Sequence, residues 1–144
     1  MKIMRTILWY DLETFGLNPR YDRIAQFAAV RTDMDLNIIE EPILLYSKLT
    51  PDYVPNPSAC LVTGITPQIV NKKGIPEAEV IAKIRDAMMV PDTITAGFNN
   101  IKFDDECIRT TLYRNLYDPY EREYRNRCSR WDIINLVRAT KDLR

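Results

Sequence analysis

The chain has 144 residues, which is enough for one ordinary domain with its own hydrophobic core. Its 20 basic and 20 acidic residues cancel, so no global positive field attracts nucleic acid, and such binding would depend on local clusters. The sequence contains neither an apolar run of about eighteen residues nor an export signal. The three cysteines have no paired spacing. We therefore expect a reduced, cytoplasmic protein that does not enter a membrane.

Three strands are predicted in the first third of the chain. The first is apolar and ends at Tyr10, and two further β-rich segments lie near Ile24 to Thr32 and near Ile38 to Leu49. The polar residues 31–37 supply the turn between the second and third strands. This order is typical of an antiparallel meander.

Helices are predicted to follow. Pro57, Pro67 and Pro76 each suit the first position of a helix, and Thr66 is the expected N-cap of the second one. The third helix runs to Met89 and has helical spacing on its apolar face, which comprises Val80, Ile81, Ile84, Ala87 and Met88.

The last third of the chain alternates strand and helix. Residues 93–98 predict a short strand, and Ile108, Leu112 and Leu116 predict one face of the next helix. A terminal helix is predicted from Trp131 to Leu143. Three strands followed by alternating helix and strand imply an α/β fold, with a mixed sheet flanked by helices.

Asp11 and Glu13 follow the first predicted strand. Side chains alternate along a strand, so these carboxylates share one face roughly 7 Å apart, while Leu12 points the other way. Such a pair can hold divalent cations of the kind used to hydrolyse phosphodiesters. Asp-x-Glu alone is a weak signal, because it occurs by chance in many chains of this length.

A second acidic motif, Asn99-Asn-Ile-Lys-Phe-Asp-Asp-Glu106, lies between the predicted strand at 93–98 and the helix that follows. Asp104 is thus at a strand-to-helix junction, where it can approach Asp11 and Glu13 if the two strands are neighbours. The alternative is that this acid caps the helix, since Asn and Asp are favoured N-cap residues. The presence of Asp-x-Glu upstream favours the metal-binding interpretation.

Asp11-Leu-Glu-Thr14 and Asn100-Ile-Lys-Phe-Asp104 resemble the first two motifs of the DEDD superfamily of 3′→5′ exonucleases. The similarity narrows to the bacterial exodeoxyribonuclease I family through four longer stretches, residues 22–33, 61–68, 113–120 and 129–138. The resemblance extends from about Ile7 to the last residue.

This resemblance implies a ribonuclease H-like fold and two-metal hydrolysis of single-stranded DNA from its 3′ end, releasing mononucleotides. It assigns Asp11, Glu13 and Asp104 to two Mg²⁺ ions, for which Mn²⁺ would substitute. The residues implied in binding the terminal nucleotide are Leu12, Thr14, Phe15, Val62, Thr63 and Ile65. For the last three a structural interpretation is also open, because Thr-Gly-Ile-Thr-Pro by itself forms a helix-capping turn.

The third motif of the family, a catalytic His followed by a fourth metal-binding Asp, has no counterpart, since the chain contains no histidine. We therefore expect residues 1–144 to be the N-terminal portion of an exonuclease domain, truncated before its last helix and inactive alone. A natural small protein without an active site is the alternative. By resemblance, domains beyond this chain would contact single-stranded DNA-binding protein.

Six arginines at 109, 114, 122, 125, 127 and 130 alternate with four tyrosines at 113, 117, 120 and 124. Arginine with aromatic rings suits single-stranded DNA, whereas a solvated segment with locally packed tyrosines explains the pattern equally well. Two other functions also stay open: a non-catalytic module that binds single-stranded nucleic acid, and a DEDD exonuclease that acts on RNA.

Overall fold

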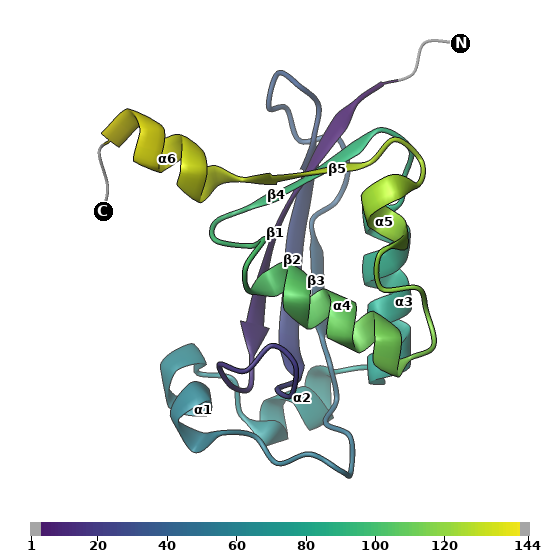
Figure 1. The fold of residues 1–144 in the computed structure, drawn as a ribbon. Coiled ribbons are helices and arrows are strands. Elements are labelled where there is room, and N and C mark those ends of the chain that lie inside the picture. The colour runs from purple at the N-terminus through teal and green to yellow at the C-terminus, as the bar shows by residue number, and fades with distance from the viewer. Residues whose placement is uncertain (1–3, 142–144) are drawn as a thin grey trace.

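The computed structural model describes residues 4–141, and within them it has five strands and six helices around one mixed sheet (Figure 1). In chain order the elements are β1 Thr6–Thr14, β2 Ile24–Thr32, β3 Ile43–Tyr46, α1 Pro57–Thr63, α2 Pro67–Lys73, α3 Glu77–Met88, β4 Thr93–Gly97, α4 Asp104–Arg114, α5 Glu121–Tyr124, β5 Ser129–Asp132 and α6 Ile133–Lys141.

The strand order in the sheet is β3-β2-β1-β4-β5. The first three strands form the expected antiparallel meander, whereas β4 runs parallel to β1 and β5 runs parallel to β4. The expected α/β fold with a mixed sheet is thus confirmed. The β1–β4 pairing stops at Trp9 and Ala96, so the carboxyl half of β1 extends beyond β4.

Helices α3 and α4 cover one face of the sheet (Figure 1). Leu8, Tyr10 and Leu12 of β1 point into this layer, where they pack against buried side chains of both helices. The predicted apolar face of α3 is correct, since Val80, Ile81, Ile84 and Met88 are buried and Ala87 packs beside them. A smaller core around Phe15 and Tyr53 holds α2 against the end of the meander.

The predicted helix starts at Pro57 and Pro67 are confirmed. Asn56 caps α1 by accepting a hydrogen bond from the Ser58 amide, and Thr66 caps α2 by accepting one from Ile69. These caps use local side chains, which is why local sequence predicts them. Pro76 is an exception, because it occupies the N-cap position and α3 begins one residue later.

Several sequence-based expectations differ from the structure in detail. The first strand does not end at Tyr10 but continues to Thr14. The third is shorter than expected, because only Ile43–Tyr46 pairs continuously with β2. Leu116 is not on the face of α4, since that helix ends at Arg114 and Leu116 is 95% exposed with a positive φ. Finally, β5 and α5 were not predicted.

The terminal helix begins at Ile133 rather than Trp131, and the end predicted at Leu143 lies outside the described residues. Among residues 4–141, no helix combines the length and apolar character needed to cross a bilayer.

Candidate active site

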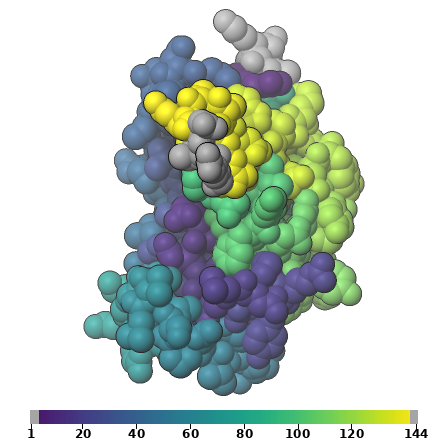
Figure 2. Space-filling model, turned by 60° about the vertical axis from the view of Figure 1, so that its left-hand side comes forward, coloured from purple at the N-terminus to yellow at the C-terminus, as the bar shows by residue number. Residues whose placement is uncertain are grey.

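Two candidate ligands lie in the part of β1 that β4 leaves unpaired. Asp11 and Glu13 point away from the α3–α4 layer, because Tyr10 and Leu12 alternate with them and pack into that layer. Their partners across β2 are Ala28 and Gln26. Both carboxylates are therefore at an open surface, and Figure 2 shows the purple N-terminal strand exposed between blue and green segments.

Asp104 reaches the same region from the first turn of α4. The chain leaves β4 at Gly97, turns through residues 98–103 and returns beside β1. A side chain at Gly97 would lie 2.9 Å from the Tyr10 carbonyl oxygen and 3.0 Å from Cβ of Asn100, so only glycine permits this approach. Asp104 is not the N-cap of α4, because Phe103 has that position.

The three carboxylates are near enough to interact electrostatically. Burial raises the pKa of Asp104 to about 7, and the charge of Asp11 acts in the same direction, with a smaller contribution from Glu13. The pKa of Glu13 is raised by burial and by Asp11, and that of Asp11 is raised by burial. The structure thus brings all three predicted acids within electrostatic range of one another.

The donor set fits a hard divalent cation, because it consists of carboxylate oxygens whose mutual repulsion a cation would relieve. The arrangement is not closed: within the described range 4–141, no three Asp, Glu, His or Cys side chains are already gathered around a point that could hold a metal ion. The structure therefore presents candidate ligands of an open site, and their carboxylates do not yet surround a common point.

A pocket of about 240 Å³ adjoins Glu13. It is formed by the end of β1, the following turn and α1, and its walls are Leu12, Glu13, Thr14, Gly16, Leu17, Asn56, Ser58, Ala59, Val62 and Thr63. Four of the six residues expected to bind the terminal nucleotide are thus together in one hollow that shares a wall with a candidate metal ligand.

The other two residues, Phe15 and Ile65, do not line this pocket. They are 1% and 7% exposed and belong to the small core beneath it. The Phe15 carbonyl oxygen accepts hydrogen bonds from the Asn56 amide, at 3.0 Å, and from the Tyr53 hydroxyl, at 3.2 Å. In this structure Phe15 and Ile65 therefore support the wall that α1 forms.

Val62 and Thr63 belong to α1, which ends in the turn suspected of a purely structural role. Gly64 has a φ of 72° and donates its amide to the Cys60 carbonyl at 2.9 Å, so it caps the helix in the left-handed conformation that glycine favours. The turn is therefore structural, yet it leaves Val62 87% exposed in the pocket.

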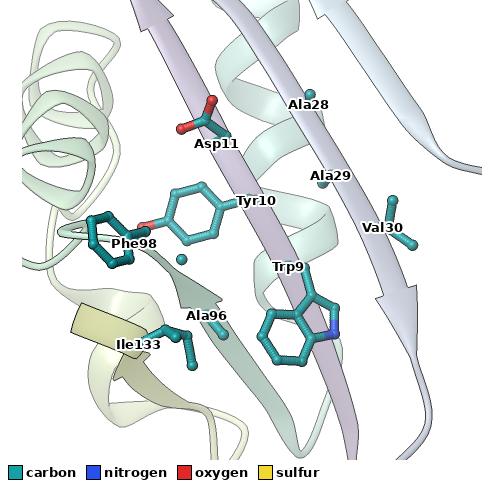
Figure 3. A pocket seen from close by; sticks show the side chains of 10 residues that line it. Trp9, Tyr10, Asp11, Ala28, Ala29, Val30, Ala96, Phe98 and Ile133 are labelled. Atoms are coloured by element: carbon teal, nitrogen blue, oxygen red, sulfur yellow. The ribbon is translucent and has the colours of Figure 1, made fainter. Parts of the chain in front are cut away.

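A second hollow, of about 410 Å³, opens on the face of the sheet that α3 and α4 do not cover (Figure 3). Its lining is almost wholly apolar and includes Trp9, Val30, Phe98 and Ile133, with Asp11 at one end. Its lining, among the described residues, contains no charged group besides Asp11, so this hollow suits packing against another apolar surface better than catalysis.

The six arginines that alternate with tyrosines between residues 109 and 130 are paired with carboxylates. The ion pairs are Arg109 with Glu106 and Glu123, Arg114 with Glu77, Arg122 with Asp105, Arg125 with Glu121, Arg127 with Asp92, and Arg130 with Asp105 and Glu123. Tyr120 and Tyr124 pack against Arg109 and Arg125. These carboxylates neutralise the positive charges with which the arginines would bind DNA phosphates. The ion pairs therefore favour the structural interpretation of this segment.

Sequence reasoning missed several residues around the site. Leu17 and Asn56 line the pocket, and Tyr10 and Asp105 are neighbours of the candidate ligands with buried side chains. The signal for Asn56 was present, because Asn before Pro predicts an N-cap at the start of α1. Nothing in the local sequence distinguishes Tyr10 or Asp105 from ordinary core and surface residues.

The sequence profile described as "RNase_T: Exonuclease" matches residues 8–144. Exodeoxyribonuclease I of Haemophilus influenzae is 54% identical over 135 residues, which are 94% of this chain and 28% of the relative. These matches confirm the resemblance drawn from the motifs.

Two solved structures share the fold. The zinc-bound form of the E. coli ExoI–ssDNA complex has a TM-score of 0.95 and 48% identity, and the match covers 99% of this chain and 30% of that one. The ExoI/SSB-Ct complex has the same TM-score and identity over 99% and 31%. The ribonuclease H-like exonuclease fold is thereby confirmed, while the chain spans only about 30% of the length of these relatives.

Proposed function

Because this chain belongs to the exonuclease family, we propose that it supplies three metal-binding carboxylates and a nucleotide pocket to an enzyme that degrades single-stranded DNA from the 3′ end. The observation that supports the proposal is that the charges of Asp11 and Glu13 both act on Asp104 and that Glu13 also lines the pocket at α1. The family is metal-dependent, and we propose Mg²⁺, replaceable by Mn²⁺, as the metal of this site.

Asp11, Glu13 and Asp104 would hold the divalent ions. Bound there, the ions would help to ionise the attacking water and would stabilise the negative charge on the leaving 3′ oxygen. The open side of the site suits this chemistry, because phosphate oxygens and water must complete the coordination of Mg²⁺. The raised pKa of Asp104 belongs to the metal-free protein and would fall when a cation binds beside it.

The pocket would hold the 3′-terminal nucleotide. Val62 would provide apolar surface for a base or sugar. The Leu12 side chain is buried in the main core, and the hydroxyls of Thr14 and Thr63 already donate to the carbonyl oxygens of Gly16 and Ala59, so these three residues would shape the pocket wall. Because Glu13 lines the same pocket, a nucleotide seated there would place its phosphate next to the carboxylates. Phe15 and Ile65 act from beneath by packing.

Single-stranded DNA is therefore the proposed substrate of the whole protein, in agreement with the ssDNA complex of the E. coli relative. We also propose that the whole protein binds the C-terminal peptide of single-stranded DNA-binding protein, by analogy with the ExoI relative in the ExoI/SSB-Ct complex.

Metal binding is tested by adding Mn²⁺ to the isotope-labelled chain and following the paramagnetic broadening of its amide signals. Broadening should centre on Asp11, Glu13 and Asp104, and Asp11→Asn should remove most of it. Asp35→Asn changes an exposed acid in the turn after β2 and should leave the broadening as it was. Broadening centred elsewhere would contradict the assignment of the site.

Hydrolysis requires a second experiment, because these 144 residues contain no histidine to serve as the expected general base. Joined to the remaining length of the H. influenzae relative, the chain should release mononucleotides from the 3′ end of single-stranded DNA. Asp11→Asn should abolish this release while oligonucleotide binding remains, because the ions act mainly on the transition state. Near-normal turnover in that variant would overturn the two-metal assignment.

A further inference from the structure

A buried polar contact joins the two segments that carry Asp11 and Asp104. Tyr10 precedes the first of these acids and is 5% exposed, and Asp105 follows the second and is 0% exposed. The Tyr10 hydroxyl donates a hydrogen bond to Oδ1 of Asp105. This contact ties β1 directly to the first turn of α4, at the residues adjacent to two candidate metal ligands.

The same hydroxyl also holds the turn between β4 and α4. Nδ2 of Asn100, whose residue is fully buried, lies 3.3 Å from the Tyr10 hydroxyl oxygen and donates to it. The Asp105 amide in turn donates to the Asn100 carbonyl oxygen at 2.8 Å. Tyr10, Asn100 and Asp105 therefore form one connected group across β1, the turn and α4.

Arginines of α5 and β5, two elements that the sequence did not predict, balance the charge of Asp105. Nη1 of Arg130, on β5, donates to Oδ2 of Asp105 at 2.9 Å. Nη2 of Arg122, on α5, lies 3.2 Å from Oδ1 but makes no aligned hydrogen bond to it. A buried carboxylate needs such counter-charge, and Arg130 is the partner that also fixes its direction.

A carboxylate of β5, that of Asp132, binds the turn between β4 and α4. Asp132 accepts hydrogen bonds from the amides of Asn99, at 2.8 Å, and Ile101, at 3.4 Å, and it also accepts one from Ile134 at the start of α6. The α5–β5 segment thus contacts the turn before Asp104 through Asp132 and the residue after Asp104 through Arg130 and Arg122.

We propose that Tyr10, Asp105 and Arg130 are positioning residues, which set the separation of the Asp11 and Asp104 carboxylates and thereby the affinity of the site for divalent cations. The inference rests on the proposed function, because it takes Asp11 and Asp104 to be metal ligands. It gives the arginine-rich segment a role in building the site rather than in contacting DNA.

The test compares Mn²⁺ affinity with thermal stability in Tyr10→Phe and Arg130→Gln. Tyr10→Phe keeps the ring in the core and removes only the hydroxyl, and Arg130→Gln removes the charge from β5. Each should weaken Mn²⁺ binding about tenfold, as loss of an outer partner of a metal site commonly does. Arg130→Lys keeps the charge and should recover part of the affinity.

Arg127→Gln is the matched control. It removes an arginine of the same segment that is paired with Asp92, away from the buried group, so Mn²⁺ affinity should be unchanged. If Tyr10→Phe and Arg130→Gln melt at lower temperature but bind Mn²⁺ as tightly as the unsubstituted chain, the group is merely structural and the proposal is wrong.

Asp11→Asn separates this inference from the proposed function. If that variant loses Mn²⁺ binding while Tyr10→Phe and Arg130→Gln keep it, only the positioning role fails. If the unsubstituted chain binds no Mn²⁺ at these carboxylates, the proposed function fails and the positioning role fails with it.

Discussion

Burial and two neighbouring carboxylates oppose the ionisation of Asp104. Its pKa is raised to about 7, first by loss of hydration and then by the charge of Asp11, with Glu13 acting in the same direction. Asp104 is 6% exposed, so the free-energy cost of ionising it arises in the folded chain and is absent from the unfolded one. A carboxyl group buried in this way reduces the stability of the folded chain when it is ionised.

This cost predicts a pH dependence of stability. The folded chain keeps the proton up to about pH 7, whereas the unfolded chain releases it near pH 4. The group therefore contributes stability that is full below about pH 4 and is lost as the pH rises through 7. Between pH 5 and 8 in EDTA, we expect the free energy of unfolding, measured with urea, to fall by on the order of 2 kcal/mol.

Two comparisons identify the group responsible. Asp104→Asn cannot titrate, so its unfolding free energy should vary less over this range. Mg²⁺ at pH 8 should restore part of the loss in the unsubstituted chain, because a ligand of the folded state stabilises it. An unchanged slope in Asp104→Asn would show that another group causes the pH dependence.

At the level of single elements, α1 is a short helix that contributes surface rather than core, since none of its residues is buried. Asn56 caps its start, Gly64 its end, and the Phe15 carbonyl ties the preceding loop to the end of β1. These contacts hold an exposed helix in place with little apolar packing, which is what a wall of a binding pocket requires.

Val62 and Leu61 on α1 offer a matched pair for testing that pocket. They are 87% and 85% exposed, but Val62 lines the pocket beside Glu13 whereas Leu61 faces a different hollow. Val62→Ser should weaken binding of a short single-stranded oligonucleotide about tenfold in an NMR titration, because burying a valine contributes about 1.5–3 kcal/mol.

Leu61→Ser should leave that affinity unchanged, and neither substitution should alter the free energy of unfolding measurably, because both side chains are already in solvent. Equal losses of affinity in the two variants would indicate a general effect on α1 instead of a contact in the pocket.

In the whole molecule, apolar burial is concentrated between the sheet and the α3–α4 layer, while α6 extends beyond β5 (Figure 1). None of the described residues of α6 is buried, and its Leu136 is 61% exposed. The stability of the domain should therefore depend on the sheet and its helical layer, and hardly on the terminal helix.

Removing residues 133–144 should accordingly lower the free energy of unfolding by less than about 1 kcal/mol. Ile84→Ala, at a position 0% exposed in the main core, should lower it by about 2–5 kcal/mol in the same urea titration. Lys83→Ala changes the exposed neighbour and should have little effect. A loss on removal of α6 as large as that of Ile84→Ala would show that the terminal helix belongs to the core.

The sequence by itself determined the meander, the starts of α1 and α2 and the buried face of α3, and it singled out three acids as candidate metal ligands. Each of these depends on residues close together in the chain: a period of apolar residues, a proline after a capping side chain, or two carboxylates on alternate positions of a strand. The motifs at Asp11 and Asp104 indicated the superfamily, and the four longer stretches at residues 22–33, 61–68, 113–120 and 129–138 identified the family.

Only the tertiary structure decided how far β1 extends, where β5 lies and which carboxylates the arginines pair with. Arg130 meets Asp105 because β5 pairs with β4, and Arg122 reaches the same carboxylate from α5. Phe15 is buried because Tyr53 and Ile65 pack on it. Such outcomes depend on contacts between residues far apart in the chain, and the free energy of those contacts outweighs local propensity. An arginine beside tyrosines has the same local pattern whether it binds a phosphate or a buried carboxylate.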